Sequence, residues 1–121
     1  MYEVIFYYDK DGNSEIVEWL DSLKRANETD KNSRINWEKT LAYIGALERY
    51  GTSIGMPYVK YLGNNLWELR PVRNRILFFC WTENRYILLH HFVKKTQKTP
   101  RREIEKALQN KKDYLEREEI E

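Results

Sequence analysis

Residues 66–100 read LWELRPVRNRILFFCWTENRYILLHHFVKKTQKTP. This segment holds three short runs rich in apolar, β-branched and aromatic residues, separated by connections of only four residues, 71–74 and 82–85. Runs of this length with such short connections predict three consecutive antiparallel strands joined by hairpins. Basic residues close each run, so we expect a packed sheet with a positively charged edge.

The flanking residues complete an α+β pattern. Turn-forming residues, N-caps and helical spacing mark each boundary. The predicted elements are a strand over 2–8, a helix from the N-cap Ser14 to about Lys24, a helix stopped by Gly51, a short strand over 59–62, and a helix begun by Thr99-Pro100. The order βααββββα predicts a mostly antiparallel sheet with helices packed on one face. The length predicts a single domain over residues 1–121.

Charge is distributed unevenly along the chain. Residues 70–112 contain twelve Lys or Arg and three Glu, a net of +9. Residues 1–69 have a net charge of −3 and residues 113–121 of −4, so the overall value of +2 conceals a basic region. A concentrated basic surface is suited to a phosphate backbone, which predicts contact with nucleic acid.

The composition also indicates the cellular compartment of the protein. Cys80 is the only cysteine and lies inside an apolar run, so we expect it to pack in the core as a small apolar side chain. A single cysteine cannot form an internal disulfide, which suits a protein of a reducing compartment. The first twelve residues lack the basic start and the apolar length of a signal peptide or membrane span. These features predict a cytoplasmic protein with no membrane partner.

Strand alternation predicts which side chains share a face of the sheet. Trp67 and Leu69 point one way, so Glu68 and Arg70 point the other. Because the helices need the apolar face, we expect Glu68 and Arg70 on the open face, where they gather with Arg75. The alternative is that Glu68 and Arg70 form only a cross-strand network at the surface.

The last predicted strand contains two adjacent histidines. Alternation places His91 on the side of Ile87 and Leu89, and His90 on the opposite side. Adjacent strand residues cannot both bind one ion, and no ligand spacing surrounds them, so we expect neither metal nor cofactor. One histidine is interpreted as a satisfied residue near the core, and the other as a candidate for proton transfer.

A site rich in Arg and Lys, without a nucleophile, suits metal-free RNA cleavage. In that reaction the ribose 2′-OH attacks its own phosphodiester, so the protein aligns the attack, neutralises the developing charge and moves two protons. Guanidinium groups suit the non-bridging phosphate oxygens, and a lysine among cations can act in proton transfer.

At these residues the chain resembles HigB/RelE-type toxins of bacterial toxin–antitoxin systems, in the phage-derived HigB-like branch. The resemblance rests on LWELR at 66–70, NRILFF at 74–79, ILLHHFVKKTQKTP at 87–100 and EIEKA at 103–107. It implies a RelE-like fold, similar to microbial ribonucleases, and a ribosome-dependent endoribonuclease that cuts mRNA. The implied partners are the ribosome, mRNA and a cognate HigA-like antitoxin, a helix-turn-helix protein.

The resemblance also implies a set of site residues. The implied catalytic residues are Arg70, Arg75, Lys94 and Lys95, with Glu68 and His91 as weaker members. The expected RNA-binding residues are Arg73, Lys98, Arg101 and Arg102. The identity of the general base stays open. Two other functions account for the charge: a non-catalytic RNA- or ribosome-binding module, and a protein whose basic surface docks an acidic partner.

Overall fold

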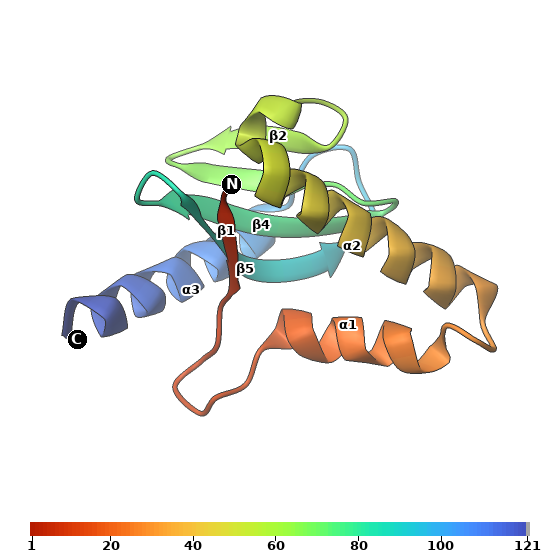
Figure 1. The fold of residues 1–121 in the computed structure, drawn as a ribbon. Helices are drawn as coiled ribbons and strands as arrows, with labels where there is room; N and C mark the ends of the chain where they lie inside the picture. Colours follow the sequence, from red (N-terminus) through yellow and green to blue (C-terminus); the bar gives the residue numbers. More distant parts are fainter. Residues whose placement is uncertain (121) are drawn as a thin grey trace.

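Five strands form one mixed sheet in the computed structural model, which describes the backbone of residues 1–120 and the side chains of residues 1–118. The elements are β1 (Glu3–Phe6), α1 (Glu15–Ala26), α2 (Lys31–Tyr50), the 3₁₀ helix η1 (Gly51–Ile54), β2 (Val59–Gly63), β3 (Leu66–Leu69), β4 (Asn74–Trp81), β5 (Arg85–Val93) and α3 (Arg101–Ile120). The strand order is β1-β5-β4-β3-β2 (Figure 1). β1 runs parallel to β5, and the other neighbours are antiparallel. The predicted α+β class and the order βααββββα are confirmed.

Helices cover both faces of the sheet, so the prediction that they pack on one face was wrong. One core joins α1 and α2 to Ile76 and Phe78, and a second core joins α3 to Leu77 and Phe79 (Figure 1). All four of these β4 side chains are fully buried or within 1% of it. A strand that is apolar on both sides exposes a large apolar surface unless each side is covered. The third helix is therefore required on the face opposite the first two.

A β-bulge between β4 and β5 changes which histidine faces which side. Leu77 pairs with His90 and Phe78 pairs with Leu88, so Leu89 is the extra residue. Beyond the bulge, His90 and Phe92 lie on the α3 face. His91 lies on the α1/α2 face, where its ring stacks on Trp19 with centroids 3.7 Å apart. The expected grouping of His91 with Leu89 was wrong, because the inserted residue reverses the alternation.

Several local signals in the sequence are realised as predicted. Ser14 caps α1, its hydroxyl accepting a hydrogen bond from the Val17 amide at 3.4 Å. Gly51 ends α2 with φ of 63°, and a Cβ there would lie 2.7 Å from the Tyr86 hydroxyl. Only glycine combines that backbone conformation with so close an approach. Thr99, in contrast, donates its hydroxyl to Glu68 rather than serving as the predicted helix cap.

The turn between β3 and β4 is fixed against the end of β5. The Lys94 amide donates to the Arg73 carbonyl at 2.7 Å, and Arg73 Nη2 donates to the Lys94 carbonyl at 3.2 Å. Val72 in this turn has φ of 58°, a left-handed conformation that is costly for a β-branched residue. The pairing brings the basic residues that follow β3 next to those that follow β5.

Candidate active site and nucleic-acid interface

Arg70 and Arg75 converge on one carboxylate, as strand alternation predicts. Glu68 Oε1 lies 3.5 Å from Arg70 Nε and 3.8 Å from Arg75 Nε. Glu68 pairs with Leu77 across β3 and β4, and Arg75 pairs with Phe92 across β4 and β5, so their side chains share the α3 face. Two neighbouring strands, β3 and β4, thus bring these groups to one place.

This cluster is buried, although we expected it on an open face. Glu68 is 3% exposed and Arg75 is 6% exposed. The segment from Lys94 to Pro100 folds over them, and the Thr99 hydroxyl donates to Glu68 Oε2 at 2.7 Å. The expectation failed because that segment, which leads into the start of α3, covers this part of the sheet. The alternative of a surface network fails for the same reason.

The Arg75 guanidinium is held by its surroundings as well as by Glu68. Its Nη1 donates to the carbonyls of Asn74 at 2.8 Å and Val72 at 3.3 Å. Burial, followed by the charge of Arg70, lowers the pKa of Arg75, and Glu68 opposes that effect. A guanidinium stays protonated in proteins, so the side chain presents a fixed positive charge in a pre-set orientation.

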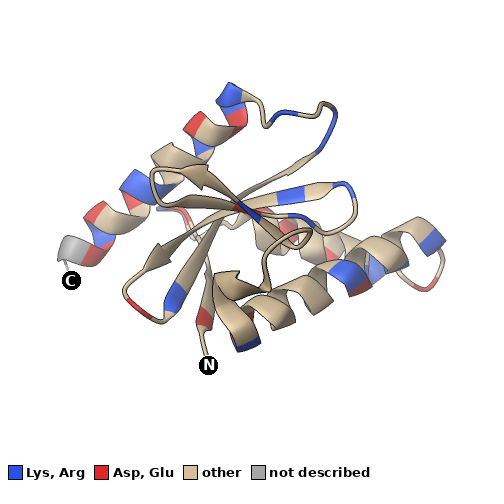
Figure 2. Ribbon diagram, turned by 90° about the horizontal axis from the view of Figure 1, so that it is seen from above, with Lys and Arg blue, Asp and Glu red and all other residues tan. Residues whose placement is uncertain are grey.

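Four cations line a surface hollow of about 390 Å³ beside this cluster. Arg73, Arg75, Lys94 and Lys95 come from the β3–β4 turn, the start of β4 and the end of β5, and no acidic residue lines the hollow. Figure 2 shows basic residues recurring along the segment between β5 and α3 and at the adjacent turn. Among the described side chains, only Arg75 of these four cations has an acidic partner, Glu68, so the hollow keeps an excess of positive charge. Such an excess favours an anion with several oxygens, such as a phosphodiester.

A larger groove of about 820 Å³ lies next to the hollow, and the two share Lys95 and Thr96 in their linings. Its lining includes Lys98, Arg101 and Arg102, which were predicted to bind RNA. Arg101 pairs with Glu105 at 3.0 Å, whereas Lys95 and Lys98 make no ion pair with any described side chain. The groove also contains apolar residues that the sequence did not indicate as part of a site.

Neither histidine joins the arginine cluster. His91 is held on the opposite face, where its Nε2 lies 3.0 Å from Asn74 Oδ1, and burial lowers its pKa to about 4. His90 lies on the α3 face of the sheet, where its Nδ1 is 2.9 Å from Glu15 Oε1 and its Nε2 is 2.8 Å from Glu103 Oε1. Burial lowers the pKa of His90, but its hydrogen bonds to Glu15 and Glu103 outweigh burial and raise that pKa overall. The bulge decides which histidine faces α3 and which faces α1 and α2, and no feature of the sequence marks its position.

Among the described residues, no group of three His, Cys, Asp or Glu side chains is arranged to hold a metal ion. No helix in the described part of the chain combines the length and apolar character needed to cross a bilayer.

The architecture defines a class of small α+β proteins whose sheet carries a basic hollow, and it is compatible with a RelE-like fold. Residues 18–112 match the family described as "Phage derived protein Gp49-like (DUF891)", and the chain belongs to that family. The family is associated with RelE/HigB-like toxins. A comparison with curated proteins finds no match.

Proposed function

We propose that this protein is a ribosome-dependent mRNA endoribonuclease, a toxin that inhibits translation and is neutralised by a cognate antitoxin. The observation that carries the proposal is the hollow in which four cations converge beside the Glu68 cluster. Membership of a family associated with RelE/HigB-like toxins supports the same reaction class. The site offers positioning and positive charge, which are what metal-free phosphodiester cleavage needs.

The reaction forms a bond between the ribose 2′-oxygen and phosphorus and breaks the bond from phosphorus to the 5′-oxygen. A base takes the 2′-OH proton, and an acid protonates the departing 5′-oxygen. The products are a 2′,3′-cyclic phosphate, or the 3′-phosphate derived from it, and a 5′-OH fragment. Because the nucleophile belongs to the substrate, the absence of a Ser or Cys nucleophile in the hollow is consistent with the mechanism.

Each cation has a role that follows from its place. Arg75, which lines the hollow, stabilises the phosphorane. Arg70 does not line the hollow, but it shares the Glu68 carboxylate, and from that side it orients the phosphate. Lys94 and Lys95, at the rim, assist proton transfer. Arg73 lines the hollow, and Lys98, Arg101 and Arg102 line the groove, where they bind flanking phosphates or ribosomal RNA. Glu68 holds both guanidinium groups in place.

The proposed antitoxin is a HigA-like helix-turn-helix protein that acts with the toxin in the cytoplasm. The unpaired cations at the rim would bind RNA indiscriminately, so an acidic partner segment that covers them would silence the protein. Co-expression with the product of the neighbouring gene is expected to relieve growth arrest. Continued arrest in the presence of every adjacent gene product would contradict this part of the proposal.

The activity is tested by induced expression followed by primer extension on cellular mRNA. Wild type is expected to arrest growth and to create new 5′ ends in phase with codons. A Lys94→Gln, Lys95→Gln double variant should lose both effects while remaining folded, because neither lysine makes an ion pair with a described side chain. The matched control is Lys112→Gln on α3, whose side chain is 78% exposed. Arg75 is unsuited to this test, since its removal leaves Glu68 buried with one partner fewer.

A second function, a non-catalytic RNA- or ribosome-binding module, is favoured by one observation. Arg75 is buried, and its Nη1 already donates to two carbonyls, so fewer of its donors are free for a transition state than at an open site. Counterion release by the exposed lysines would still bind RNA. Stalled translation with intact message in the primer-extension experiment would establish this function and refute cleavage.

A further inference from the structure

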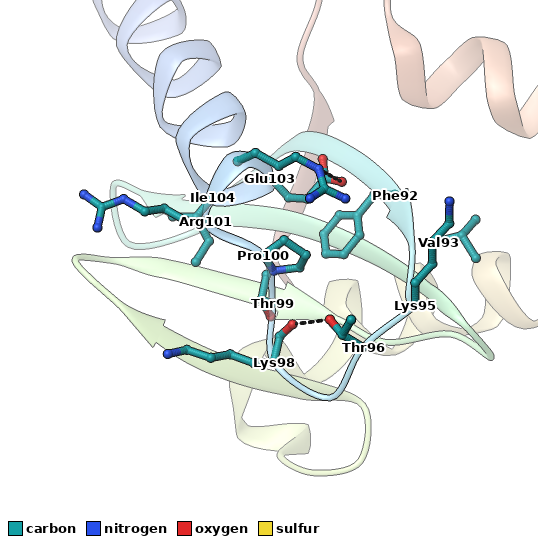
Figure 3. Close-up of a pocket in the computed structure, with 11 residues that line it drawn as sticks. Phe92, Val93, Lys95, Thr96, Lys98, Thr99, Pro100, Arg101, Glu103 and Ile104 are labelled. Atoms are coloured by element: carbon teal, nitrogen blue, oxygen red, sulfur yellow. Dashed lines mark hydrogen bonds and ion pairs between the residues drawn. The ribbon is translucent and has the colours of Figure 1, made fainter.

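The groove next to the hollow is built for more than phosphate. Its floor contains Phe92 at the end of β5, together with Pro100 and Ile104 around the start of α3. All three side chains are half-buried, so each keeps a surface open to the groove. Figure 3 shows the Phe92 ring beside the Pro100 ring, with Lys98 and Arg101 reaching outward. Phe92 and Ile104 also pack against the core on the α3 side, but phosphate binding needs only the cations, so the surfaces that these side chains turn to the groove are available for an additional contact.

Charge and shape together point to one kind of occupant. The groove volume of about 820 Å³ falls within the range typical of small-ligand sites. Lys95 and Lys98 at its rim have no ion-pair partner among the described side chains, and they leave the apolar floor uncovered. A flat ring attached to an anionic backbone fits both the apolar floor and the basic rim of the groove. The ring would pack on the floor, and the phosphate of the backbone would contact the lysines at the rim.

The one acidic residue that lines the groove, Glu103, has partners for both of its oxygens. Its Oε1 lies 2.8 Å from His90 Nε2, and its Oε2 lies 3.9 Å from Arg102 Nε. The His90 ring in turn lies next to the Phe92 ring along β5, with ring centroids 6.0 Å apart and planes 23° from parallel. Glu15 holds the other ring nitrogen of His90 at 2.9 Å. Phe92 is therefore supported by a fixed side chain, which gives a stacking platform a defined orientation.

We propose that this groove binds one unpaired nucleobase of the RNA strand, stacked on Phe92 and flanking the phosphate held in the hollow. The inference rests on the proposed function, because Lys95 lines both cavities and a strand in the hollow would continue into the groove. A base in a duplex is not available for stacking on Phe92. The groove therefore selects single-stranded RNA over double-stranded RNA, and it supplies a contact that a bare phosphate chain lacks.

The test measures binding without cleavage, using a short single-stranded RNA whose 2′-hydroxyls are methylated and which carries a fluorescent label. Phe92→Leu keeps an apolar side chain but removes the stacking ring. Because stacking is worth about 1–3 kcal/mol per base, it should weaken binding about 5- to 150-fold. An otherwise identical strand that is abasic at every position should bind wild type and Phe92→Leu equally. The control is Tyr50→Leu, which removes an exposed aromatic side chain at the end of α2 and should leave the affinity unchanged.

The outcomes separate this inference from the nuclease proposal. A loss of affinity in Phe92→Leu that is confined to strands with bases supports the groove, whether or not the protein cleaves RNA. Equal losses on both strands, or no loss on either, overturn it even if cleavage is demonstrated. Should Phe92→Leu fail to fold, photo-crosslinking of 4-thiouridine RNA to wild type decides the question. Crosslinks at Phe92, Pro100 or Ile104 support the inference, and crosslinks confined to other residues overturn it.

Discussion

The buried carboxylate of Glu68 should govern the stability of the whole site. Glu68→Gln preserves the shape of the side chain and an oxygen for the Thr99 hydroxyl, but it removes the negative charge. Arg70 and Arg75, whose side chains are 18% and 7% exposed, would then face each other without a counter-charge. Removing one partner of a buried ion pair costs about 3–5 kcal/mol, because the remaining charge is left unpaired.

The geometry places Glu68→Gln at the lower end of that range. The nitrogen–oxygen distances of 3.5 and 3.8 Å exceed those of a strong hydrogen bond, and Arg70 retains some contact with water. We therefore expect the free energy of unfolding to fall by about 3 kcal/mol. For a domain of this size that corresponds to a decrease in Tm of roughly 10 °C.

Urea denaturation followed by circular dichroism measures the effect. The matched control is Glu105→Gln, because Glu105 pairs with Arg101 at only 3.0 Å but is 58% exposed. That exposed pair should contribute less than about 1 kcal/mol despite its shorter distance. A double-mutant cycle of Glu68→Gln with Arg75→Gln should show coupling of about 1–3 kcal/mol. Equal effects of Glu68→Gln and Glu105→Gln, or no coupling, would refute the reasoning that burial makes this cluster important.

Three further predictions concern the scaffold. Gly51→Ala should lower the free energy of unfolding by at least about 2 kcal/mol in urea, since φ is 63° and the new methyl group would meet Tyr86 and Tyr2. Val72→Asn should raise it by about 1 kcal/mol, because asparagine tolerates φ of 58° better, and a decrease would contradict the assigned strain. The pKa of His91, about 4 when folded, lies below its value of 6.5 when unfolded, so wild-type stability should fall as pH drops from 6.5 to 4. His91→Gln should reduce that fall in a pH series of urea titrations, and an unchanged pH profile would refute the assignment.

Much of the fold follows from local chemistry that the sequence displays. Ser14 and Gly51 mark helix boundaries because a hydroxyl cap and a left-handed glycine are needed there. The convergence of Arg70 and Arg75 on Glu68 follows from the antiparallel hairpin of β3 and β4. The apolar run 76–79 already indicated two covered faces, although the prediction assigned the helices to one.

Other features depend on contacts between distant residues. The bulge at Leu89 lengthens one strand by a single residue, and no composition marks it, so the roles of His90 and His91 could not be assigned by alternation. The burial of Arg75 arises from the segment 94–100, which lacks regular structure and is held by the bond from Thr99 to Glu68. Pairing of β1 with β5 is equally non-local, because their registers join residues about eighty positions apart.

The pairing of β1 with β5 has a consequence for folding during translation. Glu3 aligns with Arg85 and Phe6 with Leu88, so during synthesis β1 has no neighbouring strand until β5 has left the ribosomal tunnel. Lys94 and Lys95 emerge later still. A chain that is still being translated therefore lacks both its completed sheet and the lysines of its hollow until residues 85–95 have emerged, and we expect it to gain the capacity to act on RNA only after that point.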